Sequence, residues 1–463
     1  MAKAFSAPGK CLLAGGYLVL DPTYNSYVTA LSSRMHSIAR PGADSNGNTI
    51  TITSPQFGEG QWCYSIDHGR WVGGITECNG RYNPFIEATI STVLSFMQPK
   101  NQFNFEITIY SDPGYHSQDG ATAKTSTSGA KLFLYHELPI TQVAKTGMGS
   151  SAGLVVVVVA ALLSYFYDDV DRRPGLVHNL AQVAHCFAQK KIGSGFDVAA
   201  AVYGSITYRR FEPEIIDQLL KHEIFTQSNS DELQQDYSTL LTSVVSSEWQ
   251  FNHCQNSLPP HLKLLMGDIS GGSNTPKLVS KVLEWKKSNP QQSSELYSNL
   301  NQANEDFIRA IETISTQAKS SPETYTTAFK LFSKYTCAQL ETQSDTFDRA
   351  ILQHVKAICD LVASIKNIRH NLQLLTKYSG AEIEPPSQTE LLDQCQEIKG
   401  CFGGVVPGAG GYDAIALLIN EHNIAEFVTT SKTDARFKNV TWLQLHEESQ
   451  GLVVENPDDY DGL

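Results

Sequence analysis

The chain has 463 residues and a formal net charge of −13, with 41% hydrophobic and 18% charged residues. The composition is that of a globular protein with a large core, and the length predicts two or three domains. The acidic balance argues against nucleic acid or an anionic membrane surface as the partner.

The N-terminal residues and the cysteines favour a cytoplasmic location. The first residues, MAKAFSAPGKCLL, contain no charged segment followed by a long apolar one, so we expect no secretory signal peptide. Nine cysteines without a CxxC pair predict reduced and mostly buried thiols, not a disulfide framework or a zinc site. The acidic final segment, ENPDDYDGL, is expected to be loose.

The first half of the chain reads as strands followed by helices. Turn residues separate four segments that predict strands: CLLAGGYLVL, NSYVTALSS, NTITITS and FNFEITIYSD. Residues 114–128, rich in Ser, Thr and Gly, predict a mobile loop that could close over a substrate. Helices are expected over 152–167 and 176–190, and the segment GSITYRRFEP predicts a further strand.

The second half begins in the polar stretch around 215–235, and we place the domain boundary at residue 225, giving domains 1–225 and 226–463. The segment LKLLMGDIS predicts a buried strand that leads into the loop GGSNTPK. A seven-residue apolar repeat predicts a long helix packed in the core: Ile351, Ile358, Ile365 and Leu372. With the glycine turn and strand of GVVPGAGGYDAIALLI, the pattern indicates an α+β protein of two domains.

The segment AKTGMGSSAGLVVVVVAALL could hold an anion. Lys145 precedes a loop of small residues: Gly147, Gly149, Ser150 and Ser151. Small residues let backbone N–H groups converge on a phosphate, and a helix beginning near Ser151 adds its positive end. The loop is not a Walker A sequence, and a turn that merely joins two elements is an equal alternative from the loop by itself. Although five valines favour a strand by propensity, we assign them to a buried helix after this loop.

Two further residues could act beside this loop. Lys10 follows the Pro8–Gly9 turn and directly precedes an apolar strand, which places its ammonium at the edge of the core. Asp197 follows Gly195 and precedes a run of small apolar residues, where a partly buried carboxylate needs a partner. The alternatives are a solvated surface lysine and a helix N-cap aspartate.

Three ordered segments resemble the motifs of the GHMP small-molecule kinases: APGKCLLAGGYLVL, KTGMGSSAGL and PGAGGYDAIAL. The resemblance covers essentially the whole chain. It implies an N-terminal domain like ribosomal protein S5 domain 2 and a ferredoxin-like C-terminal domain with added helices. Within the family, the chain most closely resembles the fungal members that phosphorylate 5-phosphomevalonate. The features that carry this resemblance are Lys145, GSGFDVA, GGSNTPK and Asp413. The implied reaction uses ATP and Mg²⁺ and yields 5-diphosphomevalonate, in the mevalonate pathway to isoprenoids and sterols.

The resemblance also assigns roles to residues. Lys10 and Asp197 would be catalytic. The ATP phosphates would be held by Lys145, Thr146, Gly147, Met148, Gly149, Ser150, Ser151, Ala152 and Gly153, with Ser150 or Ser151 on Mg²⁺. The acceptor would be bound by Lys10, Tyr17, Ser194, Gly195, Ser273, Thr275 and Lys277. Gly408 to Gly411 would shape the site, and at most one of Arg209 and Arg210 would face it, because neighbouring strand residues point to opposite faces.

The chain departs from the family pattern in three places. Gly15–Gly16 stands where many relatives have Gly-Glu, and no lysine precedes the third motif. Residues 176–196 contain no Asp or Glu, although His185 and Gln189 are among their polar residues, so Mg²⁺ would rest on serine, water, phosphate oxygens and Asp197. Alternative functions are mevalonate kinase, diphosphomevalonate decarboxylase and a metabolite sensor without catalysis. The oligomeric state stays open, with a monomer favoured.

Overall fold

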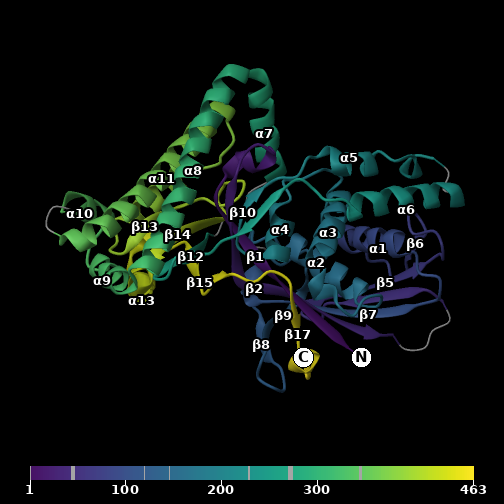
Figure 1. Cartoon of the computed structure of the whole chain (residues 1–463). Helices are drawn as coiled ribbons and strands as arrows, with labels where there is room; N and C mark the ends of the chain where they lie inside the picture. Colours follow the sequence, from purple (N-terminus) through teal and green to yellow (C-terminus); the bar gives the residue numbers. More distant parts are fainter. Residues whose placement is uncertain are drawn as a thin grey trace.

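The computed structural model describes residues 2–42, 47–118, 120–144, 146–227, 230–269, 275–343 and 347–463. Two bodies lie side by side, one built on a large sheet and the other on a small sheet covered by long helices (Figure 1). This α+β arrangement agrees with the fold class predicted from the sequence.

The N-terminal body contains a ten-stranded sheet with the central order β11-β10-β2-β7-β3-β5-β6. Its strands are β1 (Lys3–Ala14), β2 (Ser26–Pro41), β3 (Thr49–Thr53), β5 (Gln61–Ile66), β6 (Ile75–Glu77), β7 (Asn104–Ser111), β10 (Ile206–Arg209), β11 (Asn252–Gln255), β16 (Glu447–Glu448) and β17 (Val453–Glu455). A smaller sheet is formed by β4 (Phe57–Gly58), β8 (Thr122–Thr125) and β9 (Leu132–Pro139). The helices of this body are α1 (Pro84–Met97), α2 (Ser150–Leu163), α3 (Pro174–Gln189), α4 (Phe196–Tyr203), α5 (Glu214–Leu220) and α6 (Asp231–Ser246).

The C-terminal body contains a four-stranded sheet of order β13-β14-β12-β15. Its strands are β12 (Leu262–Ile269), β13 (Cys401–Val405), β14 (Ala414–Asn420) and β15 (Val440–Leu443). Its helices are α7 (Thr275–Ser288), α8 (Pro290–Ser320), α9 (Pro322–Phe332), α10 (Cys337–Thr342), α11 (Arg349–Ser379), α12 (Pro386–Gln396) and α13 (Ile424–Thr433). The predicted seven-residue stripe lies on α11 and is buried, so it packs in the core as expected.

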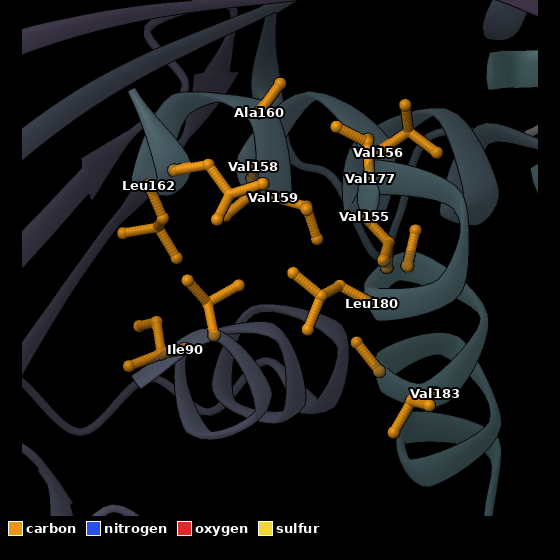
Figure 2. Close-up of a cluster of buried hydrophobic side chains, with 14 of the residues drawn as sticks. Ile90, Val155, Val156, Val158, Val159, Ala160, Leu162, Val177, Leu180 and Val183 are labelled. Carbon is orange, nitrogen blue, oxygen red and sulfur yellow. The ribbon is translucent and has the colours of Figure 1, made fainter. Parts of the chain in front are cut away.

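The five valines, Val155 to Val159, lie in helix α2, at most 1% exposed. Four of them lie near Ile90 of α1 and Val177, Leu180 and Val183 of α3 (Figure 2), and all five belong to the same hydrophobic core cluster. Because this burial stabilises each valine more than its weak strand preference disfavours the helix, the segment is helical. The predicted assignment of the valines to a helix is therefore confirmed.

Elements beyond residue 225 also contribute to the N-terminal body. Tyr237 and Leu241 of helix α6 are part of the hydrophobic core of the N-terminal body. Strand β11 pairs with β10. Near the end of the chain, β16 pairs with β2 and β17 with β1. Segments that follow the expected boundary thus complete the N-terminal sheet.

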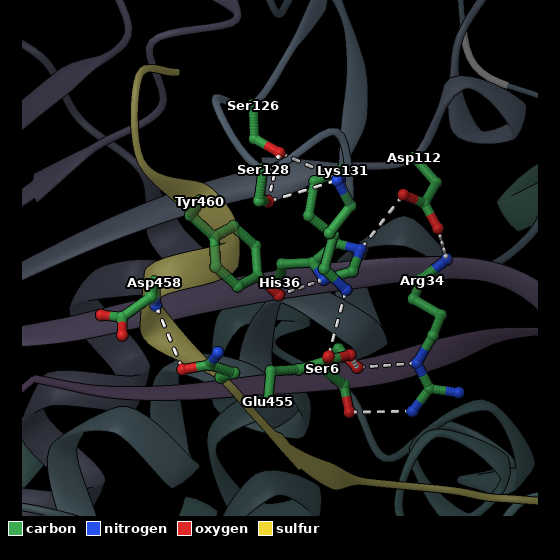
Figure 3. Close-up of polar contacts among 12 residues, drawn as sticks. Ser6, Arg34, His36, Asp112, Ser126, Ser128, Lys131, Glu455, Asp458 and Tyr460 are labelled. Carbon is green, nitrogen blue, oxygen red and sulfur yellow. Dashed lines mark hydrogen bonds and ion pairs between the residues drawn. The ribbon is translucent and has the colours of Figure 1, made fainter.

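The last residues are not loose, contrary to the expectation from their acidic composition. Tyr460 is 3% exposed and stacks with Tyr110 and Phe133. Its hydroxyl lies 2.9 Å from Nδ1 of buried His36, whose Nε2 lies 3.1 Å from Asp112 (Figure 3). One buried aromatic side chain and a paired strand therefore hold the acidic segment in place.

Two further expectations concern the thiols and residues 114–128. All nine cysteines are free thiols, as predicted. The segment 114–128 is not all loop: Tyr115 is buried and β8 pairs with β9.

In the described part of the chain, no helix has the length and apolar character needed to cross a membrane.

Candidate active site

The small-residue loop leads directly into helix α2, as the sequence predicts. Gly149 is the N-cap of α2 with φ +82°, and Gly147 has φ +75°, both in the region that favours glycine. Thr146 anchors the loop, since its hydroxyl donates to the carbonyl of Gly114 at 2.6 Å. The first N–H groups of a helix have no partner within the helix, so this end of α2 can bind an anion. Lys145 lies outside the described residues.

Strand β1 brings Lys10 to this loop. The backbone N–H of Lys10 donates to the carbonyl of Met148 at 3.1 Å, and its ammonium donates to the carbonyl of Gly147 at 3.0 Å. A Cβ atom placed on Gly149 would lie 3.1 Å from Cε of Lys10 and 3.8 Å from Cβ of Asp197. The glycine at the start of α2 therefore leaves room for both side chains, which reach it from separate elements.

Asp197 lies in the first turn of α4, after a loop held firmly by its neighbours. Gly195 has φ +76°, and its carbonyl accepts a hydrogen bond from the Gln182 amide at 2.7 Å. The carbonyl of Ser194 accepts from the Tyr208 hydroxyl at 2.8 Å. The backbone of Ser194 and Gly195 thus fixes the start of α4 and with it the position of Asp197.

Arg210 holds the preceding part of the same loop. Its guanidinium donates to the carbonyls of Leu20, Ile192 and Gly193, the last at 2.6 Å. Arg210 is buried and Arg209 is exposed. Arg210 therefore positions backbone around the site instead of presenting its charge to a substrate.

The charges of Lys10 and Asp197 act on each other, although the Lys10 ammonium bonds to a carbonyl. Burial lowers the pKa of the Lys10 ammonium from its usual value, and the charge of Asp197 acts in the opposite direction. The carboxylate therefore favours the protonated form of Lys10, the form that can bind an anion.

His185 joins the glycine loop to Asp197, a link that sequence reasoning missed. Its Nε2 lies 3.1 Å from Oγ of Ser151, 4.0 Å from Oδ2 of Asp197 and 3.1 Å from the Gln189 amide nitrogen. Burial lowers the pKa of His185, with Asp197 opposing the shift. The only signal in the sequence was that His185 and Gln189 lie four residues apart, on one face of α3, in a helix without acids.

The structure gives contacts for some of the remaining candidates and only exposure for others. The Tyr17 hydroxyl donates to the carbonyl of Ala409 at 2.9 Å, which links the first motif to the third. The third motif contacts Tyr17 and also Ile383, whose carbonyl accepts from the N–H of Gly411 at 2.9 Å. Thr275 and Lys277 are exposed in the first turn of α7, and Ser273 lies outside the described residues.

A cavity of about 360 Å³ opens beside the start of α2. Ser150 and Ser151 are part of its lining. The rest is largely apolar and aromatic, and includes Phe57, Trp62, Tyr82, Phe85 and Ile140. A flat aromatic group joined to a phosphate chain could lie here with its phosphates at the glycine loop. Sequence reasoning could not find this lining, because its residues come from distant segments.

Comparison with known proteins identifies the family. The model of the GHMP kinases N terminal domain matches residues 116–205, and that of the GHMP kinases C terminal domain matches residues 356–431. The chain is 49% identical over 466 residues to a phosphomevalonate kinase of Candida albicans, covering 100% of both chains. The chain belongs to the phosphomevalonate kinase family. It is also 32% identical to a phosphomevalonate kinase of Aspergillus fumigatus, covering 99% of this chain and 98% of that one.

A solved phosphomevalonate kinase has the same fold. The Streptococcus pneumoniae enzyme in complex with phosphomevalonate and AMPPNP matches with a TM-score of 0.57 at 16% identity. The match covers 96% of this chain and 99% of that one. The phosphomevalonate kinase fold therefore extends over both bodies described above, as the sequence resemblance implied.

Proposed function

We propose that this site transfers the γ-phosphoryl group of ATP to 5-phosphomevalonate, giving 5-diphosphomevalonate and ADP. The observation that carries the proposal is the convergence of Lys10, Asp197 and the start of α2 on Gly149. A helix N-terminus, a cation and a carboxylate at one point are what phosphoryl transfer between two anions requires. Full-length similarity to phosphomevalonate kinases supports 5-phosphomevalonate as the acceptor.

Lys10 is proposed to stabilise the charge on the transferring phosphoryl group. Its ammonium already lies 3.0 Å from a carbonyl of the glycine loop, so only a short movement would bring it onto a phosphate oxygen. In a protein of net charge −13, such a local cation is needed to offset two anionic substrates. The positive charge of Lys10 would stabilise the negative charge that develops in the transition state, and would therefore increase the rate.

Asp197 is proposed to position Lys10 and not to act as a general base. The second pKa of a phosphate monoester is about 6, so the acceptor is already mostly dianionic at neutral pH. Such an acceptor has no proton that must be removed before attack. The carboxylate of Asp197 instead favours the charged form of Lys10, as its effect on the pKa of that lysine indicates.

The residues also fit Mg²⁺. Asp197 offers a carboxylate and Ser150 or Ser151 a hydroxyl, which are the hard oxygen ligands that Mg²⁺ prefers. One carboxylate is sufficient where ATP phosphates and water supply the other ligands. When bound, the ion would neutralise charge on the phosphate oxygens.

The base of ATP is proposed to occupy the cavity beside α2. Tyr82 lies on its rim with 66% exposure, so its removal should leave the fold intact. We expect Tyr82→Ala to raise KM for ATP several-fold and to leave KM for 5-phosphomevalonate unchanged. Tyr378→Ala removes another exposed tyrosine, on α11, and should change neither. Equal effects of Tyr82→Ala on both KM values would contradict this placement.

The reaction itself is tested by measuring ADP release with Mg-ATP and one of three acceptors: mevalonate, 5-phosphomevalonate or 5-diphosphomevalonate. We expect turnover with 5-phosphomevalonate alone. Turnover with another acceptor would overturn the substrate assignment. Binding of ATP without turnover on any acceptor would instead indicate a sensor.

We further propose that the enzyme works in the cytoplasm as a monomer. The free thiol state of all nine cysteines supports a reducing compartment.

A further inference from the structure

A cluster of metal-ligating side chains lies on the C-terminal body, apart from the kinase site. It consists of His261, Glu421 and His422, and one ligand atom from each lies within 4.8 Å of the other two. Neither the proposed reaction nor the three kinase motifs account for these residues.

The topology of the small sheet brings the three residues together. Strands β12 and β14 are antiparallel, with Leu262 opposite Asn420. His261 therefore precedes β12 at the same edge where Glu421 and His422 follow β14. The backbone N–H of Glu421 donates to the carbonyl of His261 at 2.9 Å, which extends the pairing into the cluster.

Helix α9 fixes the ring of His261. The ring packs against Tyr325 and Phe329, with centroid distances of 5.8 Å to each. Its Nε2 lies 3.2 Å from Oγ1 of Thr326, so Nδ1 is the nitrogen turned toward Glu421. In histidines that ligate a metal through one ring nitrogen, the other ring nitrogen is typically held by a hydrogen bond. His261 also has φ +66°, a conformation that few residues other than glycine adopt.

Glu421 and His422 stand on an equally rigid support. Asn420 is fully buried, and its amide donates to the carbonyl of Phe329 at 2.7 Å. The Asn420 side-chain oxygen accepts from the N–H of His422 at 3.2 Å and so fixes the turn. The two ligands on this turn therefore need only side-chain rotations to meet an ion.

The donor set matches a transition metal. Nδ1 of His261 is hydrogen-bonded to Oε1 of Glu421, and Nε2 of His422 lies 4.0 Å from the same oxygen. Ligands of a tetrahedral Zn²⁺ ion lie at about 2.0–2.2 Å from the metal and so about 3.4 Å from one another. His422 must therefore move slightly closer, and Nδ1 of His261 and Oε1 of Glu421 must move apart to admit the ion. Two imidazoles and a carboxylate select Zn²⁺ over Mg²⁺ or Ca²⁺, which favour oxygen.

We propose that His261, Glu421 and His422 bind one Zn²⁺ ion, with water completing the coordination. The side chains are 20%, 32% and 33% exposed, so an ion can enter and keep a water ligand. The ion takes the place of the proton shared by His261 and Glu421, and that proton is released to the buffer. Lys263 also acts on the charge of Glu421, so the site carries a nearby cation that moderates its affinity.

The site is remote from phosphoryl transfer. His261 precedes β12, whereas Asp268 and Ile269 at the opposite end of that strand adjoin Asp413 of the third motif. Eight extended residues span about 25 Å, so the ion would tie β12 to β14 without touching the substrates.

The test is titration of the full chain, without nucleotide, with ZnCl₂ in a calorimeter. We expect one equivalent to bind with a micromolar or tighter dissociation constant. Glu421→Gln and His422→Asn should each weaken this binding at least about tenfold. The matched control is Asp236→Asn, which alters a histidine–carboxylate pair on the N-terminal body, with His222 and Asp236 3.0 Å apart, and should leave binding unchanged.

Two further measurements separate this site from the thiols and from misfolding. Co²⁺ bound here should give d–d absorption without a thiolate charge-transfer band, because no cysteine is in the ligand set. Circular dichroism should show that His422→Asn, a change at a partly exposed turn, retains the fold. The proposal is overturned if folded His422→Asn and the Glu421→Gln/His422→Asn double variant bind Zn²⁺ as tightly as the original chain, or if no saturable equivalent binds.

Discussion

Lys10 lies where strand β1, the glycine loop and Asp197 meet, and we propose that its charge stabilises the transferring phosphoryl group. We expect Lys10→Met to lower kcat by about 10²–10³, because it removes a cation aimed at the developing charge. Lys3→Met is the matched control on the same strand, since Lys3 donates to the carbonyls of Ser164 and Tyr167, away from the site. Steady-state kinetics of both variants measure the difference. Near-normal turnover of Lys10→Met would show that its charge is not needed.

Gly149 and Gly147 allow backbone strain to be separated from crowding of the site. Both have positive φ, so alanine costs backbone energy at either position, but only at Gly149 would its Cβ meet Lys10, at 3.1 Å. We therefore expect Gly149→Ala to lower kcat/KM at least about tenfold more than Gly147→Ala, because displacement of a catalytic group is costly. Equal losses in the two variants would mean that backbone strain alone is responsible.

Part of this site could be predicted from the sequence and part could not. Lys10, Asp197 and the glycine loop can be predicted because each lies in a short segment with its own chemistry and because the three motifs resemble those of a known family. The link from Ser151 through His185 to Asp197 joins three elements, and no local pattern encodes such a contact. The apolar lining beside α2 was missed for the same reason, since Phe57, Tyr82 and Ile140 are distant in the chain.

Helix α2 shows how tertiary packing decides an element whose residues prefer a strand. We expect Val158→Ala to destabilise the protein by about 1–2 kcal/mol: lost burial of its methyl groups exceeds the gain of about 0.5 kcal/mol in helix propensity. Val454→Ala, at a valine that is 55% exposed, should change stability much less. Urea denaturation measures both. A Val158→Ala variant as stable as the original chain would indicate that α2 is loosely packed.

Helix α2 could be predicted because a loop of small residues that can hold an anion is expected to lead into the N-terminus of a helix. The propensity of valine by itself predicts a strand, which is wrong here. The repeat of Ile351, Ile358 and Ile365 made α11 easier to predict, because seven residues bring a side chain back to one helix face. Strand β17 gave no comparable signal. It has three residues, Val453–Glu455, and its partner lies at the other end of the sequence.

At the scale of the whole molecule, Glu447 joins the C-terminal segment to both bodies and makes stability depend on pH. Its carboxylate accepts the N–H of Leu258 at 2.7 Å, while β16 pairs with β2. Burial raises the pKa of Glu447 to about 7 from the 4.5 of a free carboxyl. The folded protein therefore binds the proton of the Glu447 carboxyl more tightly than the unfolded chain does. The resulting stabilisation is complete below about pH 4.5 and is lost as the pH rises through 7.

We expect Glu447→Gln, which cannot ionise, to become more stable relative to the original chain as the pH is raised from 5 to 8. The expected change is about 1–3 kcal/mol, allowing for partial exposure of the group. Urea denaturation at the two pH values measures it. The matched control is Glu390→Gln, which makes the same change at an exposed glutamate on α12. A stability difference for Glu447→Gln that does not vary with pH would contradict the raised pKa.

The pairing of β1 with β17 also has a consequence for how the protein is made. Ala4 lies opposite Glu455, so the edge partner of the first strand is synthesised about 450 residues later. Until the C-terminal residues are synthesised, β1 has β2 on one side and an open edge on the other, and Tyr110 and Phe133 lack the Tyr460 ring that stacks with them. An open strand edge and uncovered aromatic rings are features that chaperones bind and that promote aggregation. The N-terminal sheet can therefore close only after residues 453–455 have been synthesised, and nascent chains cut short before residue 453 would lack the strand that closes it.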